Sequence, residues 1–285
     1  MDQRRVTILG CGYGGRAAIA PLRAAGYGLT VTTTSPDKLP GLTALLSAAG
    51  GSGADRAQVA HGDDPNSVAR AIADSHAVIL TVGAKGKDDY RRAYLQTAQT
   101  LVALVPHHPQ IQQIIYTGSY VVYGDRDGAW VDEDTPPQPA NPNGEILLAT
   151  EQTLAAIATP ERRVCIFRLG GICGPGREIV KIFRTYAGTT RPGSGGDWSN
   201  WIHLDDIVGA IAFALERRLD GIYNLVHDRP ETQKDLLERT FHQHGLDPVN
   251  WNPTEAGPLR PYNARVSNEK LKAAGYRFRH ATIPI

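Results

Sequence analysis

Three glycines near the amino terminus have the spacing of a phosphate-binding turn. The run VTILGCGYGG places Gly10, Gly12 and Gly15 directly after a short β-branched stretch. Gly10 can turn a strand sharply, Gly12 lets the backbone approach a pyrophosphate, and Gly15 lets the following helix pack close to a sheet. Glycines also mark ordinary tight turns. A dinucleotide site is nevertheless favoured, because a predicted strand precedes the turn, a helix follows it and a second strand comes about 20 residues later. The N-terminus of that helix would receive the negative charge of the pyrophosphate.

The end of the second predicted strand indicates which dinucleotide is bound. An NAD-selective site holds the ribose 2′-hydroxyl with an acidic residue at this point. Here the chain offers hydroxyl groups, with two cations nearby in sequence: Thr33, Thr34, Ser35, Lys38 and Arg16. Cations and hydroxyls suit a 2′-phosphate, so we predict NADP as the cofactor and rank NAD second. The alternative is that the threonines only end a β-branched strand and that Lys38 is a solvated charge.

Five further residues belong to the predicted cofactor site. Tyr13 and Gly14 lie inside the glycine turn. Asp63 follows a third short strand, where a polar turn could meet the adenine edge, although Asp63 could instead cap the next helix. Gly83 and Ala84 end a fourth predicted strand and are small enough for a ribose or nicotinamide to lie against the backbone.

Composition favours a small-molecule partner. The chain has 285 residues, and its 30 Lys plus Arg against 29 Asp plus Glu give a net charge of +1. No single-sign field therefore attracts nucleic acid or an anionic membrane. The three cysteines fit neither a disulfide framework nor a zinc pattern, so we expect them to be inert and expect no metal. Because the sequence has no signal-like or long apolar segment, we expect a cytoplasmic protein. A homodimer is compatible with the sequence.

Alternating elements predict an α/β fold with a doubly wound parallel sheet of the Rossmann type. Apolar, β-rich runs occupy 6–9, 29–34, 77–82, 113–118 and 163–170. Segments with helical spacing of apolar residues separate them, as expected for crossover helices.

The composition and the pattern of predicted elements change after Gly174. A Gly/Ser-rich loop, GTTRPGSGGDWSN, precedes a predicted helix over 204–218 and a strand over 222–226, and two further helices are predicted near 232–244 and 267–275. We predict a dinucleotide-binding domain over 1–170, to which about 202–227 returns. A smaller substrate lobe is predicted from about 171–201 and 228–285.

Several longer motifs carry a resemblance to a known family. They are HGDDPNSVARAI, TGSYVVYGD with WVDEDTPPQP, RLGGICGPGR, WIHLDDIVGAI and RVSNEKLKAAGY, in this order. Together with the glycine turn they resemble the extended short-chain dehydrogenase/reductase superfamily, in its NAD-dependent epimerase/dehydratase-like branch. The resemblance covers most of the chain. It implies a Rossmann domain and a substrate lobe built mainly from the C-terminal part.

The resemblance also identifies what is missing. The family uses a Ser or Thr together with a Tyr and a Lys four residues apart, and Ser119 falls at the Ser/Thr position. Aligning ATEQTL with the family's Ala-Glu places the Tyr position at Asn143 and the Lys position at Leu147. None of the seven lysines has a tyrosine four residues before it, so no other alignment restores the pair. The chain therefore looks like an atypical member.

Other residues could replace the family's tyrosine as proton donor. Tyr120 and Tyr123 are the phenols beside Ser119, but a phenol with a pKa near ~10 needs a cation to act as a base at neutral pH. We take Ser119 and Tyr120 as the catalytic candidates and expect Tyr123 to pack structurally. Glu145 is expected to favour the helix dipole instead.

Four residues are candidates for binding the substrate. Lys85 could reach a phosphate or carboxylate, and Arg177 and Arg191 lie where the resembling family binds the anionic part of its substrate. His203 could donate a proton at physiological pH. Each could instead be a solvated or structurally bonded group. Asp205 and Asp206, which follow His203 closely, are expected to cap the next helix.

Two classes of function remain. The first is an NADP(H)-dependent oxidoreductase of the atypical extended type, acting on an unidentified small molecule. The second is a non-catalytic NADP(H)-binding sensor or scaffold, which the loss of both Tyr and Lys favours. Retention of Ser119 and the Gly-rich loop favours the enzyme. A sugar-nucleotide epimerase or dehydratase ranks below both, because it depends still more on the absent tyrosine.

Overall fold

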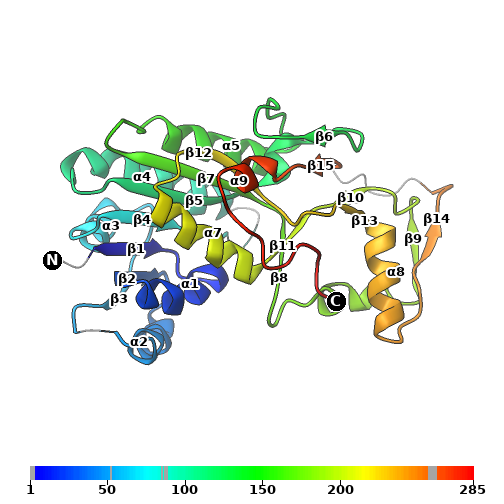
Figure 1. The fold of residues 1–285 in the computed structure, drawn as a ribbon, viewed down its shortest axis with the longest axis horizontal. Coiled ribbons are helices and arrows are strands. Elements are labelled where there is room, and N and C mark those ends of the chain that lie inside the picture. Colours follow the sequence, from blue (N-terminus) through cyan, green and yellow to red (C-terminus); the bar gives the residue numbers. More distant parts are fainter. Residues whose placement is uncertain (1–3, 52, 85, 87–88, 256–261) are drawn as a thin grey trace. The chain divides into compact units, whose positions relative to one another are not determined.

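A seven-stranded sheet forms the core of the computed structural model, which describes residues 4–51, 53–84, 86, 89–255 and 262–285. Within these residues the strand order is β12-β7-β5-β4-β1-β2-β3 (Figure 1). The strands are β1 (Arg5–Leu9), β2 (Gly28–Thr33), β3 (Arg56–Val59), β4 (Ala77–Leu80), β5 (Gln113–Ser119), β7 (Arg163–Leu169) and β12 (Gly221–Leu225). The pairings of β1 with β2 and β4, of β2 with β3 and of β4 with β5 are all parallel. The predicted doubly wound parallel fold is confirmed.

Crossover helices connect these strands. They are α1 (Tyr13–Ala24), α2 (Leu39–Ala48), α3 (Pro65–Ile72), α4 (Thr97–Leu104), α5 (Pro142–Ala155) and α7 (Leu204–Arg217). α1 packs against α2, and α3 packs against α4. Apolar side chains from β4, β5 and β7 and from α3, α4 and α5 form one buried cluster, as expected for strands covered by helices.

The chain divides into two compact units. Unit 1 comprises 1–118, 145–167 and 208–222, and unit 2 comprises 119–144, 168–207 and 223–285. This division differs from the predicted domain boundaries in that 119–144 groups with the C-terminal segments. Residues 168–170, 202–207 and 223–227, at the edges of the predicted ranges, group with them as well. Residues 119–144 are separated from the other segments of unit 2 by 145–167, so no local change of composition marks them.

Unit 2 is built from short strand pairs and helices. β8 (Gly171–Cys173) pairs with β11 (Trp201–His203), β9 (Thr190–Pro192) with β14 (Asn250–Asn252), β10 (Trp198–Ser199) with β13 (Glu231–Thr232), and β6 (Trp130–Val131) with β15 (Arg265–Val266). The helices are α6 (Ile179–Phe183), α8 (Gln233–Gln243) and α9 (Glu269–Ala273). Phe183, Trp201, Leu237 and Phe241 belong to an apolar cluster that joins α6, α8 and β11.

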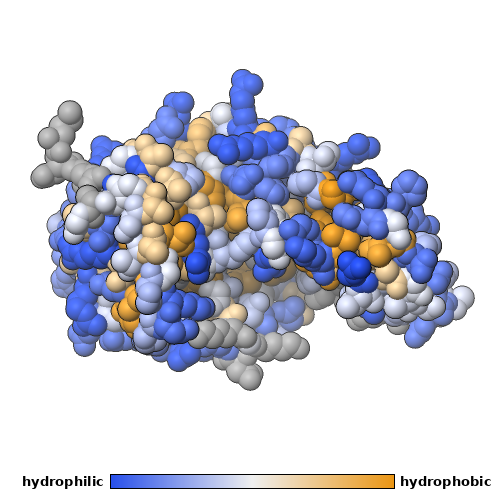
Figure 2. All heavy atoms as spheres, turned by 90° about the horizontal axis from the view of Figure 1, so that it is seen from below, coloured by the Kyte–Doolittle hydropathy of each residue, from blue (hydrophilic) through white to orange (hydrophobic). Residues whose placement is uncertain are grey.

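Large hydrophobic side chains of the described residues are nearly all covered by the protein. On the face drawn in Figure 2, hydrophobic residues lie scattered among hydrophilic ones. Trp130, with 56% of its surface accessible, is the one large hydrophobic residue that is exposed among the described residues. In the same part of the chain, no helix combines the length and the apolar character needed to cross a membrane.

Candidate active site

The glycine turn between β1 and α1 has the geometry that its spacing predicts. Gly10 has a φ of +79°, and a Cβ there would lie 2.8 Å from the backbone of Val82, so only glycine fits. A Cβ at the buried Gly15 would lie 2.8 Å from Thr81 Oγ1, which shows how closely α1 approaches the sheet. At the exposed Gly12 a Cβ would meet only a carbonyl oxygen at 3.9 Å. The space over Gly12 is therefore open to a ligand.

The start of α1 suits a pyrophosphate. The helix begins at Tyr13, and its N-cap, Gly12, has no side chain with which to bond the first-turn N–H groups. Gly14 is half-buried, and a Cβ added to it would meet nothing within 4 Å. Helix N-termini carry a partial positive charge and aim N–H groups outward, which favours anions. The residues present thus fit a dinucleotide.

The end of β2 combines an exposed surface with buried, structural hydroxyls. Thr32 Oγ1 accepts a hydrogen bond from the Gly10 N–H at 3.0 Å, and Thr33 Oγ1 accepts one from the Ser35 N–H at 3.2 Å. Both threonines are buried, Ser35 is half-buried and Thr34 is exposed. Among the predicted contacts here, the Thr34 hydroxyl is the one best placed to meet a ligand from solvent.

Two cations lie near this strand end. A Cβ at Gly41 in α2 would lie 4.0 Å from Arg16 Nη2, so the Arg16 guanidinium reaches the helix that follows β2. Lys38 is exposed at the end of the turn Pro36–Lys38, which also carries the exposed Asp37. The chain thus presents two cations and one carboxylate around the place where a ribose 2′-substituent is expected.

The turn before α3 shows which aspartate caps this helix. Asp64, rather than Asp63, is the N-cap of α3, and its carboxylate accepts from the Asn66 N–H at 3.0 Å. The suggestion that Asp63 caps this helix is wrong, because the aspartate one residue closer to the helix takes that position. Asp63 is exposed, and its predicted contact with adenine stays a prediction.

The segment after β4 is open. β4 ends at Leu80, so the predicted strand over 77–82 is two residues too long. Gly83 is exposed, with nothing within 4 Å of a Cβ built on it, and Ala84 is half-buried. This leaves room for the predicted ribose or nicotinamide contact. Lys85, the candidate that follows, lies outside the described residues.

The cysteines are buried thiols. Burial raises the pKa of Cys11 to about 12 against a smaller opposing effect of the Arg16 charge, and burial raises the pKa of Cys173 to about 11. Both side chains are therefore protonated at neutral pH, which agrees with the predicted inert role. Cys165 is also buried.

Unit 2 contains a small pocket of about 250 Å³ with Ser119 on its wall. Among the described residues its lining contains four aromatic side chains and no charged one: Ser119, Tyr120, Val121, Gly170, Gly171, Phe183, Ser199, Asn200, Trp201 and Tyr262. Tyr120 and Tyr262 meet edge to face, with ring centroids 5.8 Å apart. The two catalytic candidates thus share one pocket.

Most polar groups of this pocket are bonded within the protein. Asn200 donates to Ala264 O at 2.8 Å and accepts from the Val266 N–H at 3.1 Å. Ser199 Oγ accepts from the Trp201 indole at 2.7 Å. Ser119 Oγ accepts from the Val121 N–H at 3.4 Å, which leaves the Ser119 hydroxyl proton available to a ligand.

Tyr123 has a structural role, as expected. Its hydroxyl donates to Asn224 Oδ1 at 2.9 Å, and the guanidinium carbon of the buried Arg168 lies 4.7 Å from its ring centroid. Burial raises the pKa of Tyr123 to about 12, against the opposing Arg168 charge. Tyr123 is not among the residues that line the pocket.

The position aligned with the family's lysine is buried. Leu147 is 5% exposed, while Asn143, at the tyrosine position, is half-buried. A buried apolar side chain thus occupies the position that the resemblance aligns with the family's lysine. Glu145 is exposed in the first turn of α5, as expected for a residue that favours the helix dipole.

The other predicted substrate contacts lie elsewhere in unit 2. Arg177 is exposed and donates from Nε to Ile172 O at 3.3 Å, and the Arg191 guanidinium lies 4.1 Å from the Tyr186 ring centroid. Neither arginine lines the pocket, and neither does His203. Their roles in substrate binding stay predictions.

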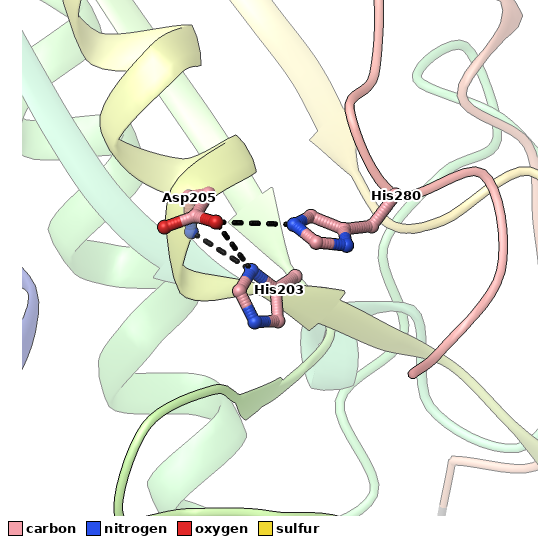
Figure 3. A group of neighbouring side chains, drawn as sticks. All are labelled: His203, Asp205 and His280. Atoms are coloured by element: carbon pink, nitrogen blue, oxygen red, sulfur yellow. Dashed lines mark hydrogen bonds and ion pairs between the residues drawn. The ribbon is translucent and has the colours of Figure 1, made fainter. Parts of the chain in front are cut away.

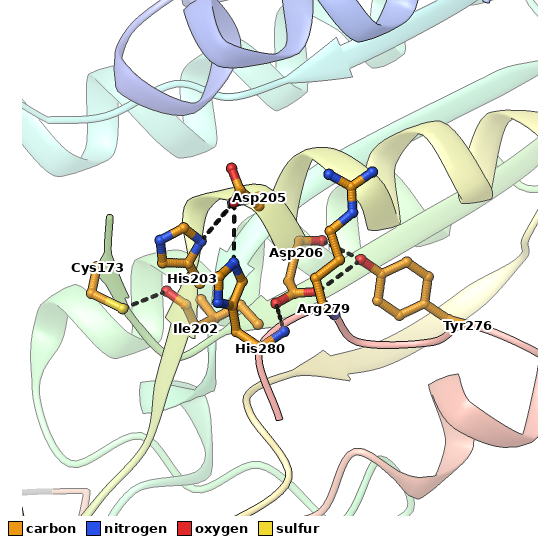
Figure 4. Close-up of polar contacts among 8 residues, drawn as sticks. All are labelled: Cys173, Ile202, His203, Asp205, Asp206, Tyr276, Arg279 and His280. Carbon is orange, nitrogen blue, oxygen red and sulfur yellow. Dashed lines mark hydrogen bonds and ion pairs between the residues drawn. The ribbon is translucent and has the colours of Figure 1, made fainter. Parts of the chain in front are cut away.

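Asp206 does more than begin a helix. Asp205 and Asp206 lie inside the first turn of α7, which starts at Leu204, so neither is the predicted cap. The buried Asp206 carboxylate accepts from the backbone N–H groups of Arg279 and His280 at 2.7 and 3.0 Å (Figure 4). Tyr276 donates to Asp206 O at 2.9 Å. Asp206 therefore anchors the C-terminal tail, a contact that only the folded chain brings about.

A buried pair in unit 1 also went unpredicted. Tyr116 and Glu151 are both buried, and a Cβ at Gly118 would lie 2.9 Å from Tyr116 Cε1 and 3.4 Å from Glu151 Oε1. Burial and the Glu151 charge raise the pKa of Tyr116 well above its usual value, so this phenol stays neutral. No local signal in the sequence marks this pair, because Glu151 is flanked by the polar residues Thr150, Gln152 and Thr153 in α5.

His227 makes the stability of the fold depend on pH. Burial lowers the pKa of His227 to about 4, with Arg239 acting in the same direction and Asp228 against it. Its Nδ1 accepts from the Arg229 N–H at 3.2 Å. The unfolded state binds a proton near pH 6.5 and the folded state only near 4, so stability is complete above pH 6.5 and is lost as the pH falls. We expect a loss of about 3 kcal/mol between pH 7 and pH 4 from this residue.

Urea unfolding of the wild type and of His227→Asn at several pH values measures this effect. Asparagine can accept the Arg229 N–H but does not titrate. The variant should show a shallower fall in unfolding free energy below pH 6.5. Equal slopes in the two proteins would contradict the assignment to His227.

Comparisons with known proteins agree with the fold. Residues 6–225 match the model of the NAD dependent epimerase/dehydratase family. The chain is 31% identical to Protein YeeZ of Escherichia coli (strain K12) over 274 residues, which cover 93% of this chain and 94% of that protein.

Solved structures share the fold. A functionally unknown conserved protein from Silicibacter pomeroyi is 24% identical with a TM-score of 0.75, covering 99% of this chain and 95% of that one. The dTDP-glucose 4,6-dehydratase of Bacillus anthracis, in complex with NAD, is 15% identical with a TM-score of 0.79, covering 97% and 92%. The chain belongs to the NAD dependent epimerase/dehydratase family.

Proposed function

We propose that this protein is an NADP(H)-dependent oxidoreductase that acts on a small, uncharged substrate with an apolar or aromatic body. The observation that carries the proposal is the Ser119 hydroxyl on the wall of an aromatic pocket that has no charged side chain in its described lining. Such a site orients a carbonyl, imine or activated alkene by one hydrogen bond and excludes water from the rest.

The glycine turn supports the cofactor. The open space over Gly12 and the uncapped start of α1 suit a pyrophosphate, and Arg16 and Lys38 supply cations for a 2′-phosphate. The neighbouring Asp37 is the feature that would favour NAD instead. When bound, the dinucleotide supplies or accepts the hydride.

The pocket argues against a sugar nucleotide. Recognition of a diphosphate normally uses Arg or Lys, and none lines this pocket within the described residues. Its volume of about 250 Å³ lies just below the range of roughly 300–1,000 Å³ that is typical of ligand pockets. A compact ring-bearing molecule fits these properties better, so the epimerase or dehydratase alternative ranks lower.

The chain's own part in the reaction is to orient the substrate and to move one proton. Ser119 Oγ is fixed by the Val121 N–H, and its hydroxyl proton can be donated to the substrate oxygen. In a reduction, carbon gains the hydride and oxygen gains a proton. Ser119 must then regain its proton from Tyr120 or from water. Leu147, at the position aligned with the family's lysine, carries no charge that would lower the pKa of a phenol.

Ser119→Ala tests the chemistry. We expect it to lower kcat by about 100-fold with a smaller change in KM, because the hydrogen bond strengthens as charge develops on the substrate oxygen. The measurement is the loss of NADPH absorbance with a panel of carbonyl, imine and activated-alkene compounds. Val121→Ala is the matched control, since it alters a neighbouring side chain of the pocket but keeps the N–H. Unchanged turnover in Ser119→Ala would overturn the assigned role.

Arg16→Ala with Lys38→Ala tests the cofactor preference. We expect the double variant to bind NADP about 10-fold more weakly than the wild type while NAD affinity changes little, because two exposed cations each contribute modestly. Titrations of both dinucleotides give the ratio. An equal loss for both, or a wild type that prefers NAD, would contradict the preference.

A non-catalytic sensor or scaffold remains the second candidate. The buried Leu147 at the lysine position favours it, because that substitution removes the cation that activates the family's base. The two proposals differ in one result. Tight NADP(H) binding without turnover across the whole substrate panel would favour the sensor.

A further inference from the structure

We propose that His203, Asp205 and His280 bind one divalent transition-metal ion, with Zn²⁺ as the best match. The two imidazoles and the carboxylate come together in unit 2, from the end of β11, the first turn of α7 and the C-terminal tail (Figure 3). One ligand atom from each residue lies within 4.8 Å of the others. This site does not depend on the proposed function.

The distances match the spacing of ligands around a metal. Asp205 Oδ2 lies 3.1 Å from His280 Nε2 and 3.4 Å from His203 Nδ1. With metal–ligand bonds of about 2.0–2.2 Å, two ligands of a tetrahedral ion lie roughly 3.3 Å apart. Two of the three separations thus require no rearrangement.

The hydrogen-bond pattern leaves two lone pairs facing each other. The Asp205 N–H points at His203 Nδ1 from 3.2 Å, so this nitrogen is an acceptor in that arrangement. The Asp205 carboxylate oxygen 3.4 Å away from it is also an acceptor. Two acceptors at this distance repel each other unless a proton or a metal ion lies between them. A metal ion would bind the His203 lone pair in place of the Asp205 N–H. That N–H lies in the first turn of α7, where N–H groups lack a partner within the helix, so it can bond to water instead.

The protein holds the two histidines in place. His203 ends β11, where it pairs in register with Cys173 of β8, and Cys173 donates to Ile202 O at 3.5 Å. The buried Asp206 fixes the backbone of Arg279 and His280, which sets the position of the His280 ring (Figure 4). The two imidazole centroids lie 3.8 Å apart. Ligands fixed in this way bind a metal with little loss of conformational freedom.

The donor set selects the class of metal. Two imidazoles and one carboxylate suit Zn²⁺ and other borderline ions, whereas Mg²⁺ and Ca²⁺ prefer oxygen ligands alone. The carboxylates of Asp205 and Asp206 provide negative charge for a divalent ion. Three protein ligands leave a coordination position open. The metal would link the C-terminal tail to β11 and α7 and so stabilise the folded state.

Isothermal titration of the tag-free full chain with Zn²⁺ tests the site. We expect one ion per chain and a rise in the thermal midpoint on addition of Zn²⁺. His280→Ala and Asp205→Asn should each weaken binding by at least ~30-fold, because loss of even an outer-shell partner costs about 10–100-fold. Asp205→Asn keeps the size of the side chain, so it remains informative if His280→Ala loosens the tail. Far-UV circular dichroism checks that both variants fold.

His242→Ala is the matched control, since His242 is an exposed histidine of α8 outside the cluster. It should bind Zn²⁺ as the wild type does. Binding of Co²⁺ should produce the visible absorption of a four- or five-coordinate ion in the wild type and not in His280→Ala. The proposal is overturned if wild-type binding is no tighter than that of the two cluster variants, if Mg²⁺ binds equally well, or if His242→Ala loses the ion.

Discussion

Gly12→Ala is expected to weaken NADP(H) binding by about 30-fold, or about 2 kcal/mol, while leaving the fold intact. A methyl group at this position would meet nothing closer in the protein than a carbonyl oxygen at 3.9 Å, so the apo fold accommodates it. It would instead occupy the space that a pyrophosphate needs in order to approach the turn. Dinucleotide titration by intrinsic fluorescence measures the first effect, and thermal unfolding without ligand measures the second.

Gly53→Ala is the matched control for this prediction. A Cβ at the exposed Gly53 meets nothing within 4 Å, and Gly53 precedes β3, away from the glycine turn. We expect its dinucleotide affinity to stay within about threefold of the wild type, which corresponds to less than ~0.7 kcal/mol. A similar loss of affinity in both variants would show that Gly12 has no special place beside the ligand.

Leu147→Lys is expected to destabilise the fold by about 4 kcal/mol at pH 7, because an ammonium replaces an apolar side chain that is 5% exposed. The folded-state pKa of this lysine would fall below its unfolded value near ~10.4. The unfolded state then binds more protons, so the penalty shrinks by up to ~1.4 kcal/mol for each pH unit as the pH rises from the folded pKa toward the unfolded one. Urea unfolding at pH 7 and pH 9 measures both the penalty and its sign.

Leu147→Met is the control, and it should cost less than ~1.5 kcal/mol with no pH dependence, since it conserves volume and polarity. A lysine tolerated without cost at pH 7 would mean that the side chain reaches water. In that case the family's catalytic lysine could be restored at this position. The expected result would instead mean that position 147 belongs to the apolar core and does not accept a charged side chain. That outcome would favour the sensor over the enzyme.

The sequence predicted those features that depend on neighbouring residues. β-branched runs separated by amphipathic segments indicated the parallel sheet, and strand ends were correct to within about two residues. The glycine spacing indicated the turn, because the φ at Gly10 and the close approach at Gly15 are local requirements of strand, turn and helix. The missing Tyr-x-x-x-Lys pair is a property of the sequence itself.

Tertiary structure alone decided the contacts between residues that are far apart in the chain. Sequence could name Ser119 and His203, but it could not tell that Ser119 lines an aromatic pocket with Tyr262 or that His203 meets His280. It suggested that Asp206 caps a helix, whereas its carboxylate holds the tail. Local patterns encode backbone conformation and burial. Side-chain partners depend on which segments the fold packs together, and single-sequence spacing carries no information about that.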